Sequence, residues 1–207
     1  MIVGNQTNRE LQAKERKKQI QQSAKTLFSA NGYYNTSIRE IADTAGIASG
    51  LIYHYFPEGK QQMLSSIVEQ GSCDMLNSLK EGMEHINSAD LSFKEGLIYI
   101  SNKMSNIFLR DPDLTKILFF EIQTTNLDSF QELKRLFPEN KELLMSFLRK
   151  KAESGEIKDV NFDITGVVLT RLIFTTTLNN HLKLLDFKEE FGLDASINFI
   201  VDLLSAK

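Results

Sequence analysis

The chain has 207 residues, of which 42% are apolar and 25% are charged, so it can bury a core that supports one or two domains. Three prolines and eleven glycines are too few turn signals for an all-β sandwich or barrel. One cysteine excludes an intrachain disulfide, and with only three scattered histidines it supplies no metal site. These features predict a helical protein of a reducing compartment, without a metal or cofactor.

The charged side chains are unevenly distributed along the chain. Residues 1–60 hold eight Lys and Arg against five Asp and Glu, whereas residues 61–207 hold sixteen against twenty-two. Attraction to phosphate depends on the local surface and decays over about 8 Å at physiological salt. The first part can therefore bind a polyanion that the rest of the chain would repel.

Neither a membrane-spanning segment nor a secretory signal is expected. The most apolar stretch, residues 167–174, contains Thr170 and Arg171 and is far shorter than the ~18 residues that a spanning helix needs. Residues 9–25 are charged and have a helical pattern, unlike the apolar core of a signal peptide. We therefore expect a cytoplasmic protein with no membrane partner.

Three helices are predicted in the first 60 residues. The first spans residues 9–30 and ends at Asn31-Gly32, and its apolar stripe consists of Ile20, Ala24, Leu27 and Phe28. The second begins at a capping box of Ser37 and Glu40 and ends at Gly46.

The third predicted helix, over residues 49–56, has only about two turns before Pro57. Such a short helix is unstable alone. It must bury Ile47, Ile52 and Phe56 against the preceding helices, which leaves the opposite side of the helix exposed.

Helical patterns also fill the rest of the chain, with a break at Pro138. They cover residues 61–86, 92–109, 111–122, 139–153, 162–185 and 190–204. The predicted fold is all-α with about nine helices, divided into an N-terminal three-helix domain (residues 1–60) and a helical body (residues 61–207).

Two helices joined by a tight turn, the second one short with a polar and aromatic outer face, have the form of a helix-turn-helix DNA reader. Small residues such as Ser49 and Gly50 permit close approach to a major groove, and hydroxyl, imidazole and phenol groups can meet phosphates and base edges. Spacing alone also allows a purely structural corner, in which Tyr53 and Tyr55 are core aromatics.

Four motifs closely resemble the tetracycline-repressor-like (TetR) family over about residues 17–70. They are Leu27-Phe28-Ser29-Ala30-Asn31-Gly32-Tyr33, Thr36-Ser37-Ile38-Arg39-Glu40-Ile41-Ala42, Ala45-Gly46-Ile47 and Ile52-Tyr53-His54-Tyr55-Phe56-Pro57. The resemblance implies a dimeric regulator with a three-helix DNA-binding head and a divergent helical body that usually binds a small effector.

By the same resemblance, ten positions match residues that commonly face DNA in the family: Thr36, Ser37, Arg39, Ser49, Gly50, Leu51, Tyr53, His54, Tyr55 and Lys60. Three features depart from the family pattern. Ala48-Ser49 replaces a common Ser followed by Lys or Arg, Leu51 replaces a small or hydroxylated residue and suits a thymine methyl group, and Pro57-Glu58-Gly59-Lys60 is one residue longer than Pro-Ser-Lys.

Polar groups within apolar runs of the body are candidates for effector binding, because a buried charge must be paired or serve a ligand. They are Glu121, Arg171, Thr175 and Thr176. Arg171 could instead pair across a dimer interface. The last two helices are apolar over wide stripes and need a further partner surface. The resemblance to the TetR family implies a homodimer through these helices, and the pattern permits it.

The sequence thus predicts a transcriptional regulator, most simply a repressor, that binds a palindromic operator in double-stranded DNA and is released by a small-molecule effector whose identity is open. Control by a protein partner is the first alternative. An enzyme that uses a cavity of the body is the second, although no catalytic constellation is recognisable.

Overall fold

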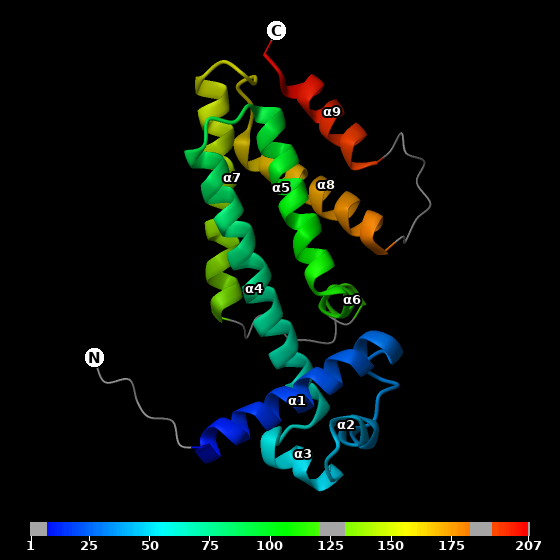
Figure 1. Ribbon diagram of the computed structural model, residues 1–207. Helices are drawn as coiled ribbons and strands as arrows, with labels where there is room; N and C mark the ends of the chain where they lie inside the picture. Colours follow the sequence, from blue (N-terminus) through cyan, green and yellow to red (C-terminus); the bar gives the residue numbers. More distant parts are fainter. Residues whose placement is uncertain (1–7, 121–130, 183–191, 207) are drawn as a thin grey trace, which may run out of the picture. The chain divides into compact units, whose positions relative to one another are not determined.

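The structure, a computed structural model, describes residues 8–120, 131–182 and 192–206 of the chain (Figure 1). In these ranges it contains nine helices and no strand, apart from an isolated bridge between Ile157 and Ser205. The helices are α1 (Asn8–Asn31), α2 (Ile38–Ala45), α3 (Ser49–Tyr55), α4 (Lys60–Ser88), α5 (Phe93–Arg110), α6 (Pro112–Phe120), α7 (Gln131–Glu153), α8 (Phe162–Leu182) and α9 (Leu193–Leu204). The predicted all-α fold is confirmed.

The chain forms two compact units that differ in extent from the predicted domains. The first comprises Met1–Gly71 with Asp113–Ser129, and the second comprises Ser72–Pro112 with Phe130–Lys207. Helix α4 therefore contributes its first turns to one unit and the remainder to the other.

Local sequence signals determine the helix ends in the first unit. Ser37 caps α2 through the predicted capping box with Glu40, and Gly46 ends the helix in the left-handed conformation at φ 66°. Helix α3 starts after Ala48, which makes no side-chain cap hydrogen bond. Its stability therefore depends on packing.

The core of the first unit is built from one apolar stripe per helix. Ile20, Ala24 and Phe28 of α1 are buried, as are Ile52 of α3 and Phe56 directly after it. Helix α2 packs against α1 and α3, and the first turns of α4 add buried Met63, Leu64, Ile67 and Val68. The core fixes α3 although the helix has only seven residues.

Helix α6 belongs to the first unit although it follows α5 in the sequence. The hydroxyl of Ser29 donates to Asp113 Oδ1 at 2.7 Å. A Cβ atom at Gly71 would lie 2.4 Å from Leu114 Cδ2, so this glycine lets the leucine pack directly on the backbone of α4.

The second unit has its own core, formed by α5, α7, α8, α9 and the later turns of α4. Helix α8 packs against α5, α7 and α9. A Cβ atom at Gly96 of α5 would lie 2.3 Å from Phe147 Cζ of α7, so this glycine lets the Phe147 ring pack directly on the backbone of α5. Ser92 caps α5 through a capping box with Glu95.

One predicted helix boundary is wrong. The sequence predicts a break at Pro138, whereas α7 runs through this residue. A proline removes one backbone donor and disfavours helical geometry at the preceding residue, but it does not forbid a helix. The buried stripe of Leu144, Met145, Phe147 and Leu148 anchors the helix beyond it.

None of the helices in the described ranges is both long and apolar enough to cross a membrane. The residues that the structure describes likewise contain no group of three or more His, Cys, Asp or Glu side chains that could hold a metal ion.

We expect Gly96→Ala to lower the free energy of unfolding by about 1–3 kcal/mol, because the added methyl group overpacks the contact with Phe147. Urea unfolding at neutral pH measures this change. Gly50→Ala is the matched control, since a Cβ atom at Gly50 meets nothing within 4 Å. Equal stability of the two variants would contradict the close packing of α5 on α7.

Candidate nucleic-acid interface

The outer face of α3 is exposed, as the sequence predicts. Leu51 is 41% exposed and Tyr53 is 53% exposed, and His54 is exposed beside them. Tyr55 is partly buried, and its ring stands edge-on to that of His54 with 5.0 Å between the centroids. The alternative in which Tyr53 belongs to the core does not fit this placement.

Gly50 lies in the first turn of α3 and has no structural need to be glycine. A Cβ atom there meets nothing within 4 Å, and the backbone is not in the left-handed region. Glycine in a helix is less favourable than alanine by about 1 kcal/mol. The missing side chain therefore leaves room outside the helix that no described residue fills.

The N-terminus of α2 is exposed next to α3. The Glu40 carboxylate accepts hydrogen bonds from the backbone N–H of Ser37 at 2.7 Å and from its hydroxyl at 2.7 Å. These bonds are the main cause of the lowered pKa of Glu40, and the Lys60 ammonium adds a smaller electrostatic contribution. Ser37 thus stays at the surface with its hydroxyl already engaged.

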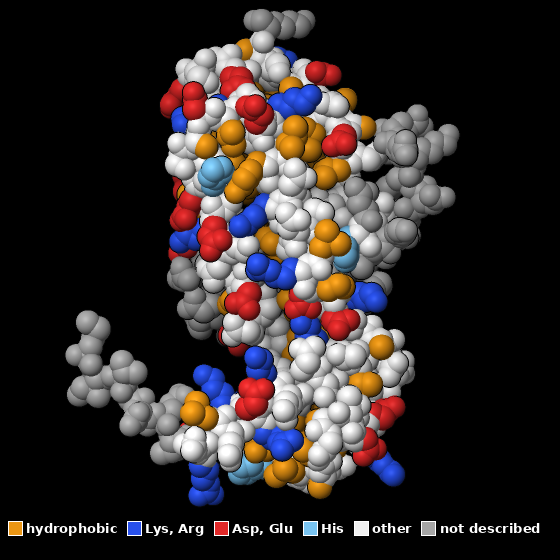
Figure 2. All heavy atoms as spheres, in the orientation of Figure 1, with side chains coloured by type: hydrophobic (Ala, Val, Ile, Leu, Met, Phe, Trp, Pro, Cys, Tyr) orange, Lys and Arg blue, Asp and Glu red, His pale blue; other side chains and the backbone are white. Residues whose placement is uncertain are grey.

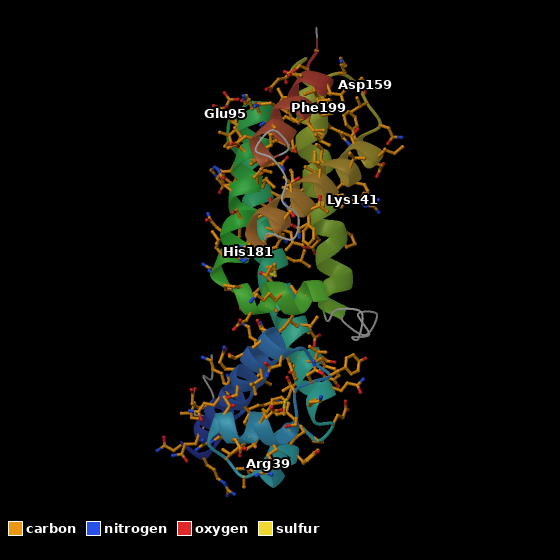
Figure 3. All side chains as sticks on the ribbon, turned by 90° about the vertical axis from the view of Figure 1, so that its right-hand side faces the viewer. Arg39, Glu95, Lys141, Asp159, His181 and Phe199 are labelled. Atoms are coloured by element: carbon orange, nitrogen blue, oxygen red, sulfur yellow. The ribbon has the colours of Figure 1, made fainter. Side chains whose placement is uncertain are left out.

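Arg39 is the exposed basic side chain of α2 (Figure 3). Its side chain is 86% exposed, and its Nε lies 3.8 Å from Asp43 Oδ2. A pair so exposed contributes little to stability, so the guanidinium can leave it for an anion at small cost.

Two of the ten predicted DNA-facing side chains are engaged inside the protein. Thr36 is only 1% exposed, and its hydroxyl donates to the carbonyls of Gly32 at 2.9 Å and Leu27 at 3.3 Å. Lys60 Nζ donates to the carbonyls of Tyr33 at 2.8 Å and Thr36 at 2.5 Å. The expectation of a hydroxyl contact from Thr36 is therefore corrected, because burial leaves the group no access to a phosphate.

Further positive charge lies on α1, whose Lys and Arg side chains are seen on the surface in Figure 2. Lys14, Lys17 and Lys18 are exposed, and Lys17 Nζ stands 5.2 Å from the centroid of the Phe56 ring. These groups raise the electrostatic potential of the first unit without reading any sequence.

The second unit encloses a small apolar cavity between α4, α5, α7 and α8. Its volume is about 20 Å³, roughly the room for one water molecule. The lining residues include Leu79, Met83, Leu97, Ile100, Met104, Phe147, Thr170 and Ile173. Sequence reasoning did not single out this set, because helix periodicity alone cannot distinguish a cavity wall from solid core.

The predicted effector residues do not line this cavity. Arg171 and Thr175 are exposed on α8, and the Thr175 hydroxyl donates to the Arg171 carbonyl at 2.7 Å. Thr176 is partly buried and donates to the Leu172 carbonyl at 2.7 Å. Glu121 lies outside the described residues. Both the effector role and the dimer-pairing role of Arg171 stay predictions.

Apolar side chains gather on the exposed faces of α8 and α9. Phe199 of α9, labelled in Figure 3, is 65% exposed, and Ile164 of α8 is 63% exposed. The other exposed apolar side chains of the two helices are Val167, Val168, Phe174 and Leu203. Apolar groups in this number on neighbouring helices indicate a surface that another protein covers.

Two helices at a tight turn, a short second helix with an exposed reading face, and a basic surface around it define a helix-turn-helix DNA-binding protein. Residues 20–67 match the family model "Bacterial regulatory proteins, tetR family". This stretch is thus similar to the DNA-binding region of TetR-family transcriptional regulators.

The curated proteins to which the chain is similar include other regulators. The fatty acid metabolism regulator protein of Bacillus subtilis is 25% identical over 186 residues, which cover 90% of this chain and 92% of that protein. The transcriptional repressor KstR2 of Mycolicibacterium smegmatis is 40% identical over 57 residues, or 28% of this chain and 27% of the repressor.

Solved structures share the whole fold. The regulator PfmR of Thermus thermophilus matches with a TM-score of 0.62 and 20% identity over 96% of each chain. The regulator FadR of Bacillus subtilis, crystallised in complex with stearoyl-CoA, matches with a TM-score of 0.61 and 24% identity over 90% of this chain and 96% of its own.

The lowered pKa of Glu40 predicts a contribution to stability that depends on pH. A depressed carboxyl pKa stabilises the folded state above the pKa of the unfolded chain, and this contribution is lost as the pH falls through the folded value. Glu40→Gln keeps a capping side chain without titrating. Urea unfolding at pH 7 and pH 3 should show a smaller loss of stability for this variant than for the wild type, and equal losses would contradict the expectation.

Proposed function

We propose that this protein is a homodimeric repressor that binds a near-palindromic operator through α2 and α3 and dissociates when a small molecule binds in the second unit. The observation that carries the proposal is the outer face of α3, where Leu51, Tyr53 and His54 are exposed around the vacant space at Gly50. A major groove about 12 Å wide admits such a helix at close range.

Eight side chains or backbone positions form the proposed DNA-contacting surface: Ser37, Arg39, Ser49, Gly50, Leu51, Tyr53, His54 and Tyr55. Leu51 is suited to a thymine methyl group and so to reading sequence, whereas Arg39 is suited to phosphate. Thr36 and Lys60 support this surface from within.

A dimer follows from the exposed apolar faces of α8 and α9. Two copies related by a two-fold axis bury the same patch on each other, which would cover Ile164 and Phe199 at once. The symmetry also presents two copies of α3 to a duplex, so the operator would be a near-palindrome with half-sites about one helical turn apart or somewhat more.

We propose a long-chain acyl-CoA as the effector class. The described cavity is apolar and is flanked by Met83 and Met104, unbranched side chains that repack readily around a flexible chain. Relatives in which fatty acid metabolism or stearoyl-CoA is named match 90% of this chain. Because the cavity holds only about 20 Å³, an acyl chain would have to open the core, and that opening would be the signal.

The small cavity also favours a second candidate function. A solid second unit is what a regulator controlled by a protein partner would have, with no metabolite in its core. Such a partner would have to change the affinity for DNA by binding one conformation in preference to another.

Gly50→Ala tests the DNA-binding surface. We expect at least about tenfold weaker binding to a duplex from the region upstream of the protein's own gene, because the added methyl group enters the space reserved for the groove; tenfold corresponds to ~1.4 kcal/mol. Fluorescence anisotropy at fixed salt measures the affinity. Unfolding of the same variant should show unchanged or higher stability. Specific binding of undiminished strength would refute the placement of α3 in the groove.

Phe199→Glu tests the dimer surface. A charge buried at the centre of an apolar interface is strongly unfavourable, so sedimentation should show a monomer where the wild type is a dimer. Leu109→Glu is the matched control, because Leu109 is an exposed leucine of α5, outside the two helices concerned. Dissociation of both variants, or of neither, would count against an interface at α8 and α9.

Stearoyl-CoA tests the effector class. At a concentration 100 times its dissociation constant, a ligand stabilises the folded state by about 2.7 kcal/mol, so we expect a higher melting temperature together with release of the operator duplex. Coenzyme A without the acyl chain is the control. If stearoyl-CoA changes neither melting nor DNA binding, the candidate controlled by a protein partner is favoured.

A further inference from the structure

Lys60 is the first residue of α4, and its ammonium group is held by the turn that joins α1 to α2. Nζ donates to the carbonyl oxygens of Tyr33 at 2.8 Å and Thr36 at 2.5 Å. The same nitrogen stands 4.6 Å from the centroid of the Tyr33 ring, within the range of a cation–π interaction. Two of the three ammonium donors are thus used inside the protein.

The turn that Lys60 holds leads directly into α2. Thr36 is buried, and its hydroxyl bonds the carbonyls of Gly32 and Leu27 near the end of α1. Ser37 follows as the N-cap of α2. The peptide between them is therefore anchored on α1 by the Thr36 hydroxyl and on α4 by the Lys60 ammonium, so its position is set from both sides.

The start of α4 also contacts the second helix of the reader. Gly59, directly before Lys60, has φ +62°, and a Cβ atom there would lie 3.4 Å from Tyr53 Cε1 and 3.6 Å from Ile38 Cδ1. The residue directly before α4 thus lies against side chains of both α2 and α3. Any shift of the first turn of α4 must be passed to both helices or break the two hydrogen bonds of Lys60.

A lysine held in this way is poorly placed to act as a phosphate ligand. Charge-assisted hydrogen bonds at 2.5 and 2.8 Å are strong, and a phosphate would have to displace them or be satisfied with the third donor. Displacement would cost both carbonyls their charged donor, and the Tyr33 carbonyl would keep only the weaker hydrogen bond from the Thr36 N–H at 3.4 Å. Arg39, by contrast, has a side chain that is 86% exposed.

We infer that Lys60 is a positioning residue of the DNA-binding unit: its ammonium ties the first turn of α4 to the turn before α2 and so sets the placement of the reading surface, without binding phosphate itself. This inference rests on the proposed function, in which α2 and α3 contact DNA.

Lys60→Met, which keeps the stem and removes the donors, provides the test. Affinity is measured for the upstream duplex and for a random duplex of equal length, each over a range of salt concentrations, with thermal melting alongside. We expect about tenfold weaker binding to the upstream duplex, little change with the random duplex, and an unchanged salt slope. Non-specific binding depends on surface charge and tolerates small errors in helix placement.

Arg39→Gln is the matched control for a lost phosphate contact, and its salt slope should fall by about 0.9. Lys60→Arg should restore most of the binding to the upstream duplex, because a guanidinium can donate to both carbonyls. If Lys60→Met does not fold, Lys60→Gln gives the same readouts, since its amide can still reach one acceptor and carries no charge.

Two results would overturn the inference. A parallel loss on both duplexes with a salt slope lower by about 0.9 would make Lys60 a phosphate ligand. A lower melting temperature with both affinities unchanged would make it a purely structural residue. Failure of the proposed function is distinguishable from either, because the wild type would then show no preference for the upstream duplex over the random one.

Discussion

The burial of Ile52 and Phe56 is the constraint on which the DNA-binding unit depends. Helix α3 has seven residues and no side-chain cap, so its own hydrogen bonds cannot hold it in water. Both apolar side chains are completely buried. Because the inner face provides the stability, the outer face is free to carry residues chosen for contact with a partner, including a glycine that weakens the helix. Rigidity and recognition are thus assigned to opposite sides of one short helix.

The features predicted correctly from the sequence are those decided by neighbours in the chain. The capping box of Ser37 with Glu40 needs only residues three positions apart, and the end of α2 at Gly46 needs only one residue. The exposed face of α3 was predictable because Ile52 and Phe56 already define its inner side. Pro138 shows the limit of such reasoning, since packing further along α7 decides whether the helix continues.

The candidate site was predicted less completely, because the access of a side chain depends on segments distant in sequence. Thr36 is hydroxylated and next to an N-cap, which fits a phosphate contact, but its hydroxyl is buried and points to the carbonyls of Gly32 and Leu27, four and nine residues earlier. The ammonium of Lys60 reaches across 24 residues to Thr36. Arg171 lies in an apolar run yet faces outward, because α8 carries apolar residues around much of its circumference. The cavity could not be predicted at all, since it arises where four helices fail to fill space.

Leu114 of α6 packs directly on the backbone of α4 at Gly71, and this contact limits how the DNA-binding unit can be exchanged between such regulators. The first unit is built from two separate segments of the chain. The second segment supplies Leu114, which the N-terminal segment alone lacks. A fragment that contains only the N-terminal segment would leave the backbone at Gly71 exposed to water where Leu114 now packs. An exchange of the DNA-binding unit between regulators therefore keeps this packing only if α6 is transferred together with the N-terminal segment. The unit that can be exchanged intact is thus encoded by two separate stretches of the gene.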